Sequence, residues 1–75
     1  MPENLLYKFW GKNLKNYRQA CNLTQEQAAE KLDTTDATIS RWEAGLVMPN
    51  DEMKLRVAEL YGVQAFAIFP LVRMS

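Results

Sequence analysis

A short segment of the sequence gathers polar and charged side chains of the kind that form hydrogen bonds with the edges of DNA bases. An arginine can donate to guanine O6 and N7, an aspartate can accept from a cytosine amino group, and a small apolar side chain can contact a thymine methyl. Side chains of these types occur in Thr35, Asp36, Ala37, Ser40 and Arg41. The segment therefore indicates recognition of double-stranded DNA rather than catalysis.

Two short helices joined by a tight turn are needed to position these side chains, and the sequence has start and stop signals for both. Thr24 and Gln27 match the S/T-x-x-E/Q capping box, which predicts that the first helix begins after Thr24. Thr35 is a suitable N-cap for the second helix, and Gly45 is suited to end it with a positive φ. We predict a helix-turn-helix over residues 24–44.

Apolar residues at helical spacing give each of these two helices one face for burial. The first helix has Ala28, Ala29 and Leu32, and the second has Ile39 and Trp42. A tryptophan can also stack on a nucleic-acid base, but the spacing from Ile39 places Trp42 on the buried face. We therefore assign Trp42 to the core.

Three further helical segments complete the predicted fold, and no segment shows the alternating pattern of a strand. The first covers residues 4–20; Gly11 interrupts it and leaves open whether the residues before it form an extension or a separate turn. Asn50 is an N-cap for a helix that ends at Gly62, and a short helix over residues 64–69 precedes Pro70. The prediction is an all-α, compact five-helix bundle in one domain, residues 1–75.

Composition excludes several classes of protein. The single cysteine, Cys21, cannot form an internal disulfide, and without histidine it leaves too few ligands for zinc. No nucleophile–base pair or glycine-rich phosphate loop supports an enzyme, so we expect no metal, cofactor or small-molecule substrate. No signal peptide or apolar run long enough for a membrane span is present, and we expect a cytoplasmic protein that does not bind membranes.

The charge balance is unusual for a protein that binds DNA. Nine Lys and Arg residues balance nine Asp and Glu residues, whereas DNA-binding domains are more often basic. The segment before residue 26 is nevertheless locally basic, with three lysines and Arg18 against Glu3. We predict phosphate contacts from Lys12 and Lys15; the alternative is a solvated helix face.

Residues 11–63 resemble the lambda-repressor and Cro type of helix-turn-helix protein. The resemblance implies a compact five-helix bundle whose third helix lies in the major groove of DNA. The matching pieces are Arg18, the LTQ of residues 23–25, Ala29, the DTT turn of residues 33–35, the ISRWE of residues 39–43, Gly45, Pro49, Ala58 and the GV of residues 62–63.

The resemblance also implies roles for individual residues. Thr35, Asp36, Ala37 and Arg41 match family positions that face base edges, with Ser40 as a lesser candidate. For Asp36 the alternative is a first-turn acid that stabilises the helix dipole. For Arg41 the alternatives are a phosphate contact or an ion pair with Asp36.

Other matches imply contacts with the DNA backbone and within the fold. Gln25 matches a position that contacts phosphate, and the alternative is a solvated glutamine. Thr38 either reaches a phosphate or is solvated. Arg18 and Glu43 match a pair that forms a salt bridge in relatives, which would tie the first helix to the recognition helix.

Two departures from the family pattern are visible. Asp33 occupies a turn position where the family usually has glycine, and aspartate tolerates the left-handed conformation better than most residues. The loop of residues 46–48, Leu-Val-Met, is apolar where relatives often carry lysine or arginine. We therefore expect weak DNA binding by a single copy.

The C-terminal segment, residues 63–75, is apolar enough to form both a core closure and a dimer interface. The predicted interface residues are Phe66, Ile68, Phe69, Leu71 and Val72. A two-fold dimer would place two recognition helices about 34–36 Å apart on a palindromic operator. The sequence thus predicts a homodimeric regulator that represses a promoter by occupying it. The alternative is a protein-interaction module such as an antitoxin component.

Overall fold

The structure, a computed structural model, describes residues 3–70 and contains helices and loops over that range. Its helices are α1 (Glu3–Ala20), α2 (Gln25–Lys31), α3 (Asp36–Glu43), α4 (Asp51–Tyr61) and α5 (Ala65–Ile68). The predicted all-α bundle is confirmed. None of the helices described over residues 3–70 has both the length and the apolar composition that crossing a bilayer requires.

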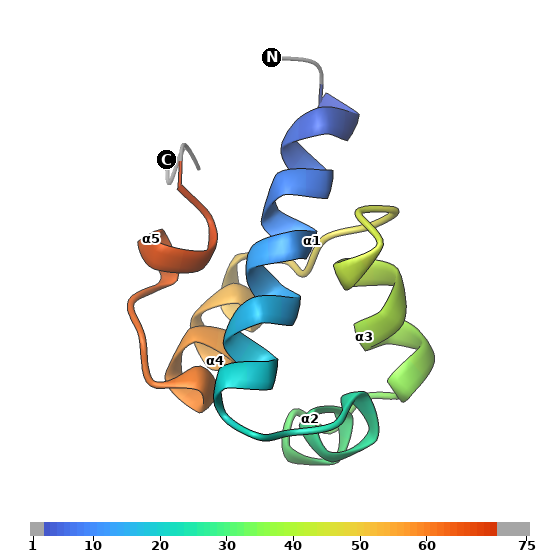
Figure 1. Cartoon of the computed structure of the whole chain (residues 1–75), viewed down its shortest axis with the longest axis vertical. Helices are drawn as coiled ribbons and strands as arrows, with labels where there is room; N and C mark the ends of the chain where they lie inside the picture. The colour runs from blue at the N-terminus through green and yellow to red at the C-terminus, as the bar shows by residue number, and fades with distance from the viewer. Residues whose placement is uncertain (1–2, 71–75) are drawn as a thin grey trace.

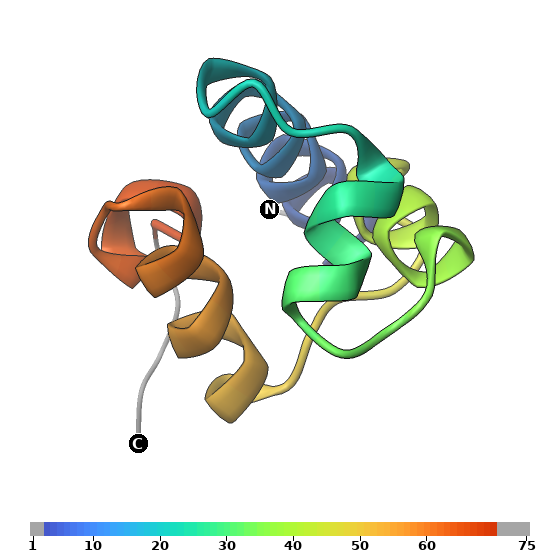
Figure 2. The same ribbon diagram turned by 90° about the horizontal axis from the view of Figure 1, so that it is seen from below.

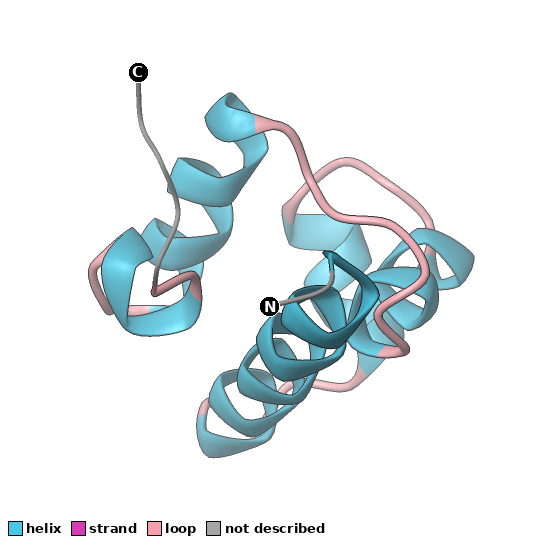
Figure 3. Ribbon diagram, turned by 90° about the horizontal axis from the view of Figure 1, so that it is seen from above, coloured by secondary structure: helices cyan, strands magenta, loops and turns pink. Residues whose placement is uncertain are grey.

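The long helix α1 runs through the middle of the molecule, with α3 on one side and α5 on the other (Figure 1). The view from below places α2 beside α3, and α4 beside α5 (Figure 2). The connection from α3 to α4 crosses between these two groups as an extended loop (Figure 3). The helix-turn-helix therefore forms one half of the bundle, and α1 supports it from the centre.

The predicted N-caps form the expected hydrogen bonds. The Gln27 amide donates to Thr24 Oγ1 at 3.0 Å, and the Thr24 amide donates to Gln27 Oε1 at 2.9 Å, which completes the capping box. The Met53 amide donates to Asn50 Oδ1 at 2.9 Å. These side chains satisfy amide groups that have no partner within the first turn of a helix.

Four of the helices are followed by a residue in the left-handed region. Asp33 has a φ of 56°, and Gly45 and Gly62 have φ values of 76° and 73°. The aspartate thus takes the conformation that glycine usually supplies at this turn, as predicted. Asn22, with a φ of 58°, ends α1 in the same way.

Gly11 lies within one continuous helix, which settles whether the residues before it form a separate turn. A Cβ at Gly11 would lie 2.6 Å from the carbonyl oxygen of Glu43 and 2.7 Å from that of Trp42. The helix therefore accepts a residue of poor helix propensity because α1 passes directly against the end of α3.

The core joins all five helices. Its fully buried side chains include Leu14 of α1, Ile39 of α3 and Val57 of α4. Trp42 is 6% exposed, so its assignment to the core is confirmed. The remaining members are Trp10, Ala28, Ala29, Leu32, Ala58, Tyr61, Ile68 and Phe69.

The C-terminal helix closes this core, which corrects part of the predicted dimer interface. Ile68 and Phe69 are fully buried, and the ring of Trp10 meets that of Phe69 edge-on at 5.6 Å between centroids. A side chain without exposed surface cannot contact a second copy, so neither residue lines a dimer interface. Phe66 remains exposed at 67%, whereas Leu71 and Val72 lie outside the described residues.

Candidate nucleic-acid interface

One face of α3 is exposed to solvent while the opposite face packs into the core. The side chains of Asp36, Ala37, Ser40 and Arg41 are exposed. Ile39 on the opposite face is 1% exposed. Because α3 lies at the edge of the bundle (Figure 1), no other helix covers its outer face. The five predicted base-contacting residues, including the exposed N-cap Thr35, therefore occupy one accessible surface.

The hydroxyl group of Thr35 is engaged at the start of α3. Thr35 Oγ1 accepts from the Thr38 amide at 3.2 Å and lies 3.0 Å from Thr38 Oγ1. Thr35 thus caps the helix, and its hydroxyl group has two partners while that of Thr38 has one. Thr38 is half-buried beside the exposed Thr35.

Arg41 does not form the ion pair with Asp36 that was considered as an alternative. Among residues 5–70, the carboxylates that form ion pairs are Glu43, with Arg18, and Asp51, with Lys54. The Arg41 guanidinium therefore retains its hydrogen-bond donors in solvent. Asp36 remains at the first turn of α3, where a negative charge interacts favourably with the helix dipole.

A buried ion pair fixes α3 against α1, as the sequence predicted. Arg18 Nε lies 2.6 Å from Glu43 Oε2, and Arg18 Nη2 donates to Glu43 Oε1 at 3.0 Å. The two side chains are only 9% and 4% exposed. The hydrogen bonds to Glu43 raise the pKa of Arg18, so the guanidinium stays charged. Two parallel hydrogen bonds in a fixed plane give this contact a defined geometry.

The same ion pair reaches α2 through Gln25. Gln25 Nε2 donates to Glu43 Oε1 at 3.1 Å, and Arg18 Nη1 donates to the carbonyl oxygen of Leu23 at 2.7 Å. One carboxylate therefore connects the long helix with both helices of the helix-turn-helix. Gln25 is half-buried by this arrangement, and its side-chain amide keeps a second N–H.

Tyr61 of α4 adds a neutral group near this carboxylate. Burial, with a smaller contribution from the negative charge of Glu43, raises the pKa of Tyr61 to about 12. The phenol therefore stays protonated at neutral pH. It adds packing around the ion pair without adding charge.

Three lysines form a stripe on α1 that borders the end of α3. Lys8, Lys12 and Lys15 are exposed, and none of them forms an ion pair within the described residues. A Cβ at Gly45 would lie 2.8 Å from the Cα of Lys8, which places this part of α1 against the end of α3. The locally basic segment thus flanks the exposed face of α3.

A model of the helix-turn-helix family matches residues 14–67, which include α2, α3, the loop and α4. The chain belongs to the helix-turn-helix family of the lambda-repressor and Cro type. Its described residues show the arrangement that the family resemblance implied, a compact bundle with α3 at its surface.

Three relatives of this helix-turn-helix chain are named as transcription regulators. It is 39% identical to an HTH-type transcriptional regulator of Methanocaldococcus jannaschii, over 75% of this chain and 85% of the relative. It is 38% identical to ImmR of Bacillus subtilis, over 71% of this chain and 42% of ImmR. The transcriptional activator BcrR of Enterococcus faecalis is 37% identical over 72% of this chain. The matched part makes up only 26% of BcrR.

A solved structure has the same fold. The clp gene regulator ClgR of Corynebacterium glutamicum superimposes with a TM-score of 0.81, covering 89% of this chain and 71% of the ClgR chain. The sequence identity is 24%, so this likeness concerns the helix-turn-helix fold alone.

An acidic depression beside α3 was not anticipated from the sequence. It lies between α2 and the start of α3 and has a volume of about 560 Å³; the carboxylates in its lining are Glu26, Glu30 and Asp36. Glu26 and Glu30 are four residues apart and therefore share a face of α2. That spacing is the signal that sequence reasoning missed. Phosphate groups would be repelled there, in contrast to the lysine stripe.

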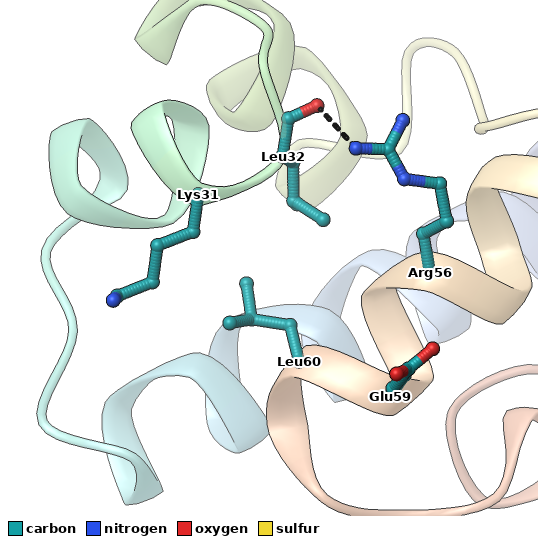
Figure 4. Close-up of a pocket in the computed structure, with 5 residues that line it drawn as sticks. All are labelled: Lys31, Leu32, Arg56, Glu59 and Leu60. Carbon is teal, nitrogen blue, oxygen red and sulfur yellow. Dashed lines mark hydrogen bonds between the residues drawn. The ribbon is translucent and has the colours of Figure 1, made fainter.

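A second depression, of about 420 Å³, lies between α2 and α4, away from the exposed face of α3 (Figure 4). Its lining includes Lys31, Arg56 and Glu59. Arg56 Nη2 donates to the carbonyl oxygen of Leu32 at 3.4 Å, and this bond joins α4 to the end of α2. We assign this depression a place in the packing of the bundle and no part in the interface.

Proposed function

We propose that this chain is a sequence-specific regulator of transcription that binds double-stranded DNA with the exposed face of α3. The observation that carries the proposal is the division of α3 into a buried face and a free polar face of hydrogen-bonding side chains. A helix of this width fits the major groove of B-DNA. The names of the three relatives support a role in transcription.

The central contact is Arg41 with guanine. Its unpaired guanidinium has the geometry to donate two hydrogen bonds to O6 and N7. Asp36 accepts from the amino group of a cytosine, and Ala37 contacts a thymine methyl. Ser40 and Thr35 add hydrogen bonds at the edges of the same surface.

Phosphate groups fix the position of the duplex. Lys12 and Lys15 neutralise phosphates beside the end of α3, and no acidic side chain among residues 5–70 pairs with them. Gln25 and Thr38 donate hydrogen bonds to phosphate oxygens. Because Glu43 accepts one N–H of Gln25, the carboxylate turns the amide nitrogen inward and fixes where the second N–H points.

Two copies bind a palindromic operator and repress by occupying the promoter. The support for pairing is the small number of basic groups on one copy, because two linked half-sites raise the effective affinity without new contacts in either half. The exposed Phe66 is the described residue that supports a C-terminal dimer interface. Leu71 and Val72 complete the interface that we propose.

A gel-shift experiment against fragments of genomic DNA tests the proposal. At low salt a subset of fragments should be retained in the presence of excess random competitor DNA. If no fragment is retained selectively while a protein partner co-purifies with the chain, the protein-interaction module is the better assignment and the DNA-binding proposal fails.

A further inference from the structure

The outward face of α1 carries exposed apolar and basic side chains together. Leu5, Lys8, Phe9 and Lys12 have the spacing i, i+3, i+4 and i+7, which places them on one side of the helix. Leu5 is 50% exposed and Phe9 is 44% exposed. The two lysines are exposed and have no ion-pair partner among residues 5–70. Two large apolar side chains that are exposed side by side indicate an interaction site more strongly than two exposed lysines do.

The outward face of α4 carries the complementary set. Glu52, Leu55 and Glu59 have the spacing i, i+3 and i+7 and lie on one side of that helix. Leu55 is 54% exposed, and both glutamates are exposed. Neither glutamate forms an ion pair in the described part of the chain. Arg56, also exposed, lies at i+4 on the same side, so this face carries one large apolar side chain, two negative charges and one positive charge.

Both faces point away from the core, because the buried residues Leu14 of α1 and Val57 of α4 lie on the opposite side of each helix. In Figure 1 α1 lies in front and α4 behind, and the view from below separates them in the same way (Figure 2). They cannot meet within one chain. One neighbouring copy also cannot engage both faces at once, so contacts between them repeat from copy to copy.

We propose that the α1 face of one copy binds the α4 face of a second copy, head to tail. Lys8 and Lys12 approach Glu52 and Glu59, while Leu55 packs against Leu5 and Phe9. Opposite charges favour this pairing. A contact between the α1 faces of two copies would instead bring lysines against lysines. The carboxylates beside α3 are a poorer match, because α2 presents no large exposed apolar side chain.

The contact is weak between free copies and effective between copies already aligned. Exposed ion pairs contribute little free energy, and the apolar area involved is small. Two copies on neighbouring DNA sites are held at a high effective concentration, at which a weak contact through Leu5, Lys8 and Phe9 makes their binding cooperative while Lys12 contacts phosphate. This role rests on the proposed DNA binding, whereas the contact itself is tested without DNA.

Sedimentation equilibrium of the full chain at low salt tests the contact with a charge exchange. One variant carries K8E and K12E, so that both of its faces are acidic; the other carries E52K and E59K, so that both are basic. A control for the acidic variant carries K15E and K31E, which lower the net charge by the same amount as K8E and K12E and leave the residues of both faces unchanged. Circular dichroism confirms that each variant keeps its helices.

We expect the weight-average mass of the wild type and of the control to rise with concentration. The rise should disappear in each variant alone and return in a one-to-one mixture of the two variants. In the wild type it should be largely lost at about 1 M salt, where the Debye length falls to about 3 Å. Every protein, including the one with unaltered faces, is measured with Phe66→Asp in the background, which disrupts the proposed C-terminal interface. The proposal is overturned by an absent rise in the wild type, by a rise that survives in both variants, or by a mixture that stays at the mass of its components.

Discussion

A Cβ on Gly11 would lie 2.6 Å from the carbonyl oxygen of Glu43, closer than a real Cβ approaches an oxygen atom. Glu43 is the last residue of α3. Its side chain is bound by Arg18, which lies about two turns after Gly11 on α1. The absence of a side chain at residue 11 and the ion pair at residue 18 therefore act on the same end of α3. Together they fix the position of the proposed recognition helix.

Gly11→Ala should lower the free energy of unfolding, although alanine favours a helix by about 1 kcal/mol over glycine. The added methyl group meets two backbone carbonyls that cannot rotate away, and overpacking of this kind costs about 1–3 kcal/mol. Urea denaturation measures the change. In Gly62→Ala the Cβ meets nothing within 4 Å, so only the strain of the positive φ remains. Equal stability of wild type and Gly11→Ala would contradict the close approach.

Arg18→Met should be among the most destabilising single substitutions in the chain. It leaves the buried Glu43 carboxylate with Gln25 as its remaining side-chain donor, and stranding one partner of a buried pair costs about 3–5 kcal/mol. The double variant Arg18→Met, Glu43→Leu should recover much of this loss, because no unpaired charge remains. Thermal denaturation of both variants tests the account, which fails if the double variant is the less stable of the two.

The stability of the fold should decline as the pH rises from about 10 to about 12. Burial raises the pKa of Tyr61 from 10.0 to about 12, so the unfolded chain releases this proton at lower pH than the folded chain does. Deprotonation therefore favours unfolding in that window, by at most about 2–3 kcal/mol. Denaturant titrations at several pH values should show a shallower decline for Tyr61→Phe. Identical slopes for the wild type and Tyr61→Phe would count against this origin.

Phe66→Asp and Phe69→Asp should have different consequences. Phe66 is 67% exposed, so a charge there should disrupt self-association at the C-terminus and preserve helical content. Phe69 is fully buried against Trp10, so a charge there should unfold the chain. Sedimentation and circular dichroism separate the two effects. A dimer that persists in Phe66→Asp would place the interface elsewhere.

The local features of the fold were accessible from the sequence because they depend on neighbouring residues. The capping hydrogen bonds of Thr24, Thr35 and Asn50 join groups three residues apart, and the left-handed turn at Asp33 needs only a tolerant side chain. Helical spacing also placed Trp42 in the core. Such signals survive without knowledge of the tertiary structure.

The features that the sequence left open depend on contacts between distant segments. Helix propensity alone gave no reason for Gly11, whose explanation lies on α3. Apolar side chains near the C-terminus look alike whether they face the core or a second copy, so Ile68 and Phe69 were assigned to the wrong surface. The bond between Gln25 and Glu43 joins residues eighteen positions apart and has no local signal.

Selection of bound sequences from a pool of random DNA duplexes is the most direct test of the claim that the exposed face of α3 reads bases. The wild type should enrich a motif with two symmetric half-sites. Arg41→Ala should relax the preference at one base pair in each half-site, with a loss of about 1–3 kcal/mol in discrimination. The account is contradicted if the wild type enriches no motif. It is also contradicted if Arg41→Ala enriches the same motif as the wild type with the same preference at every base pair.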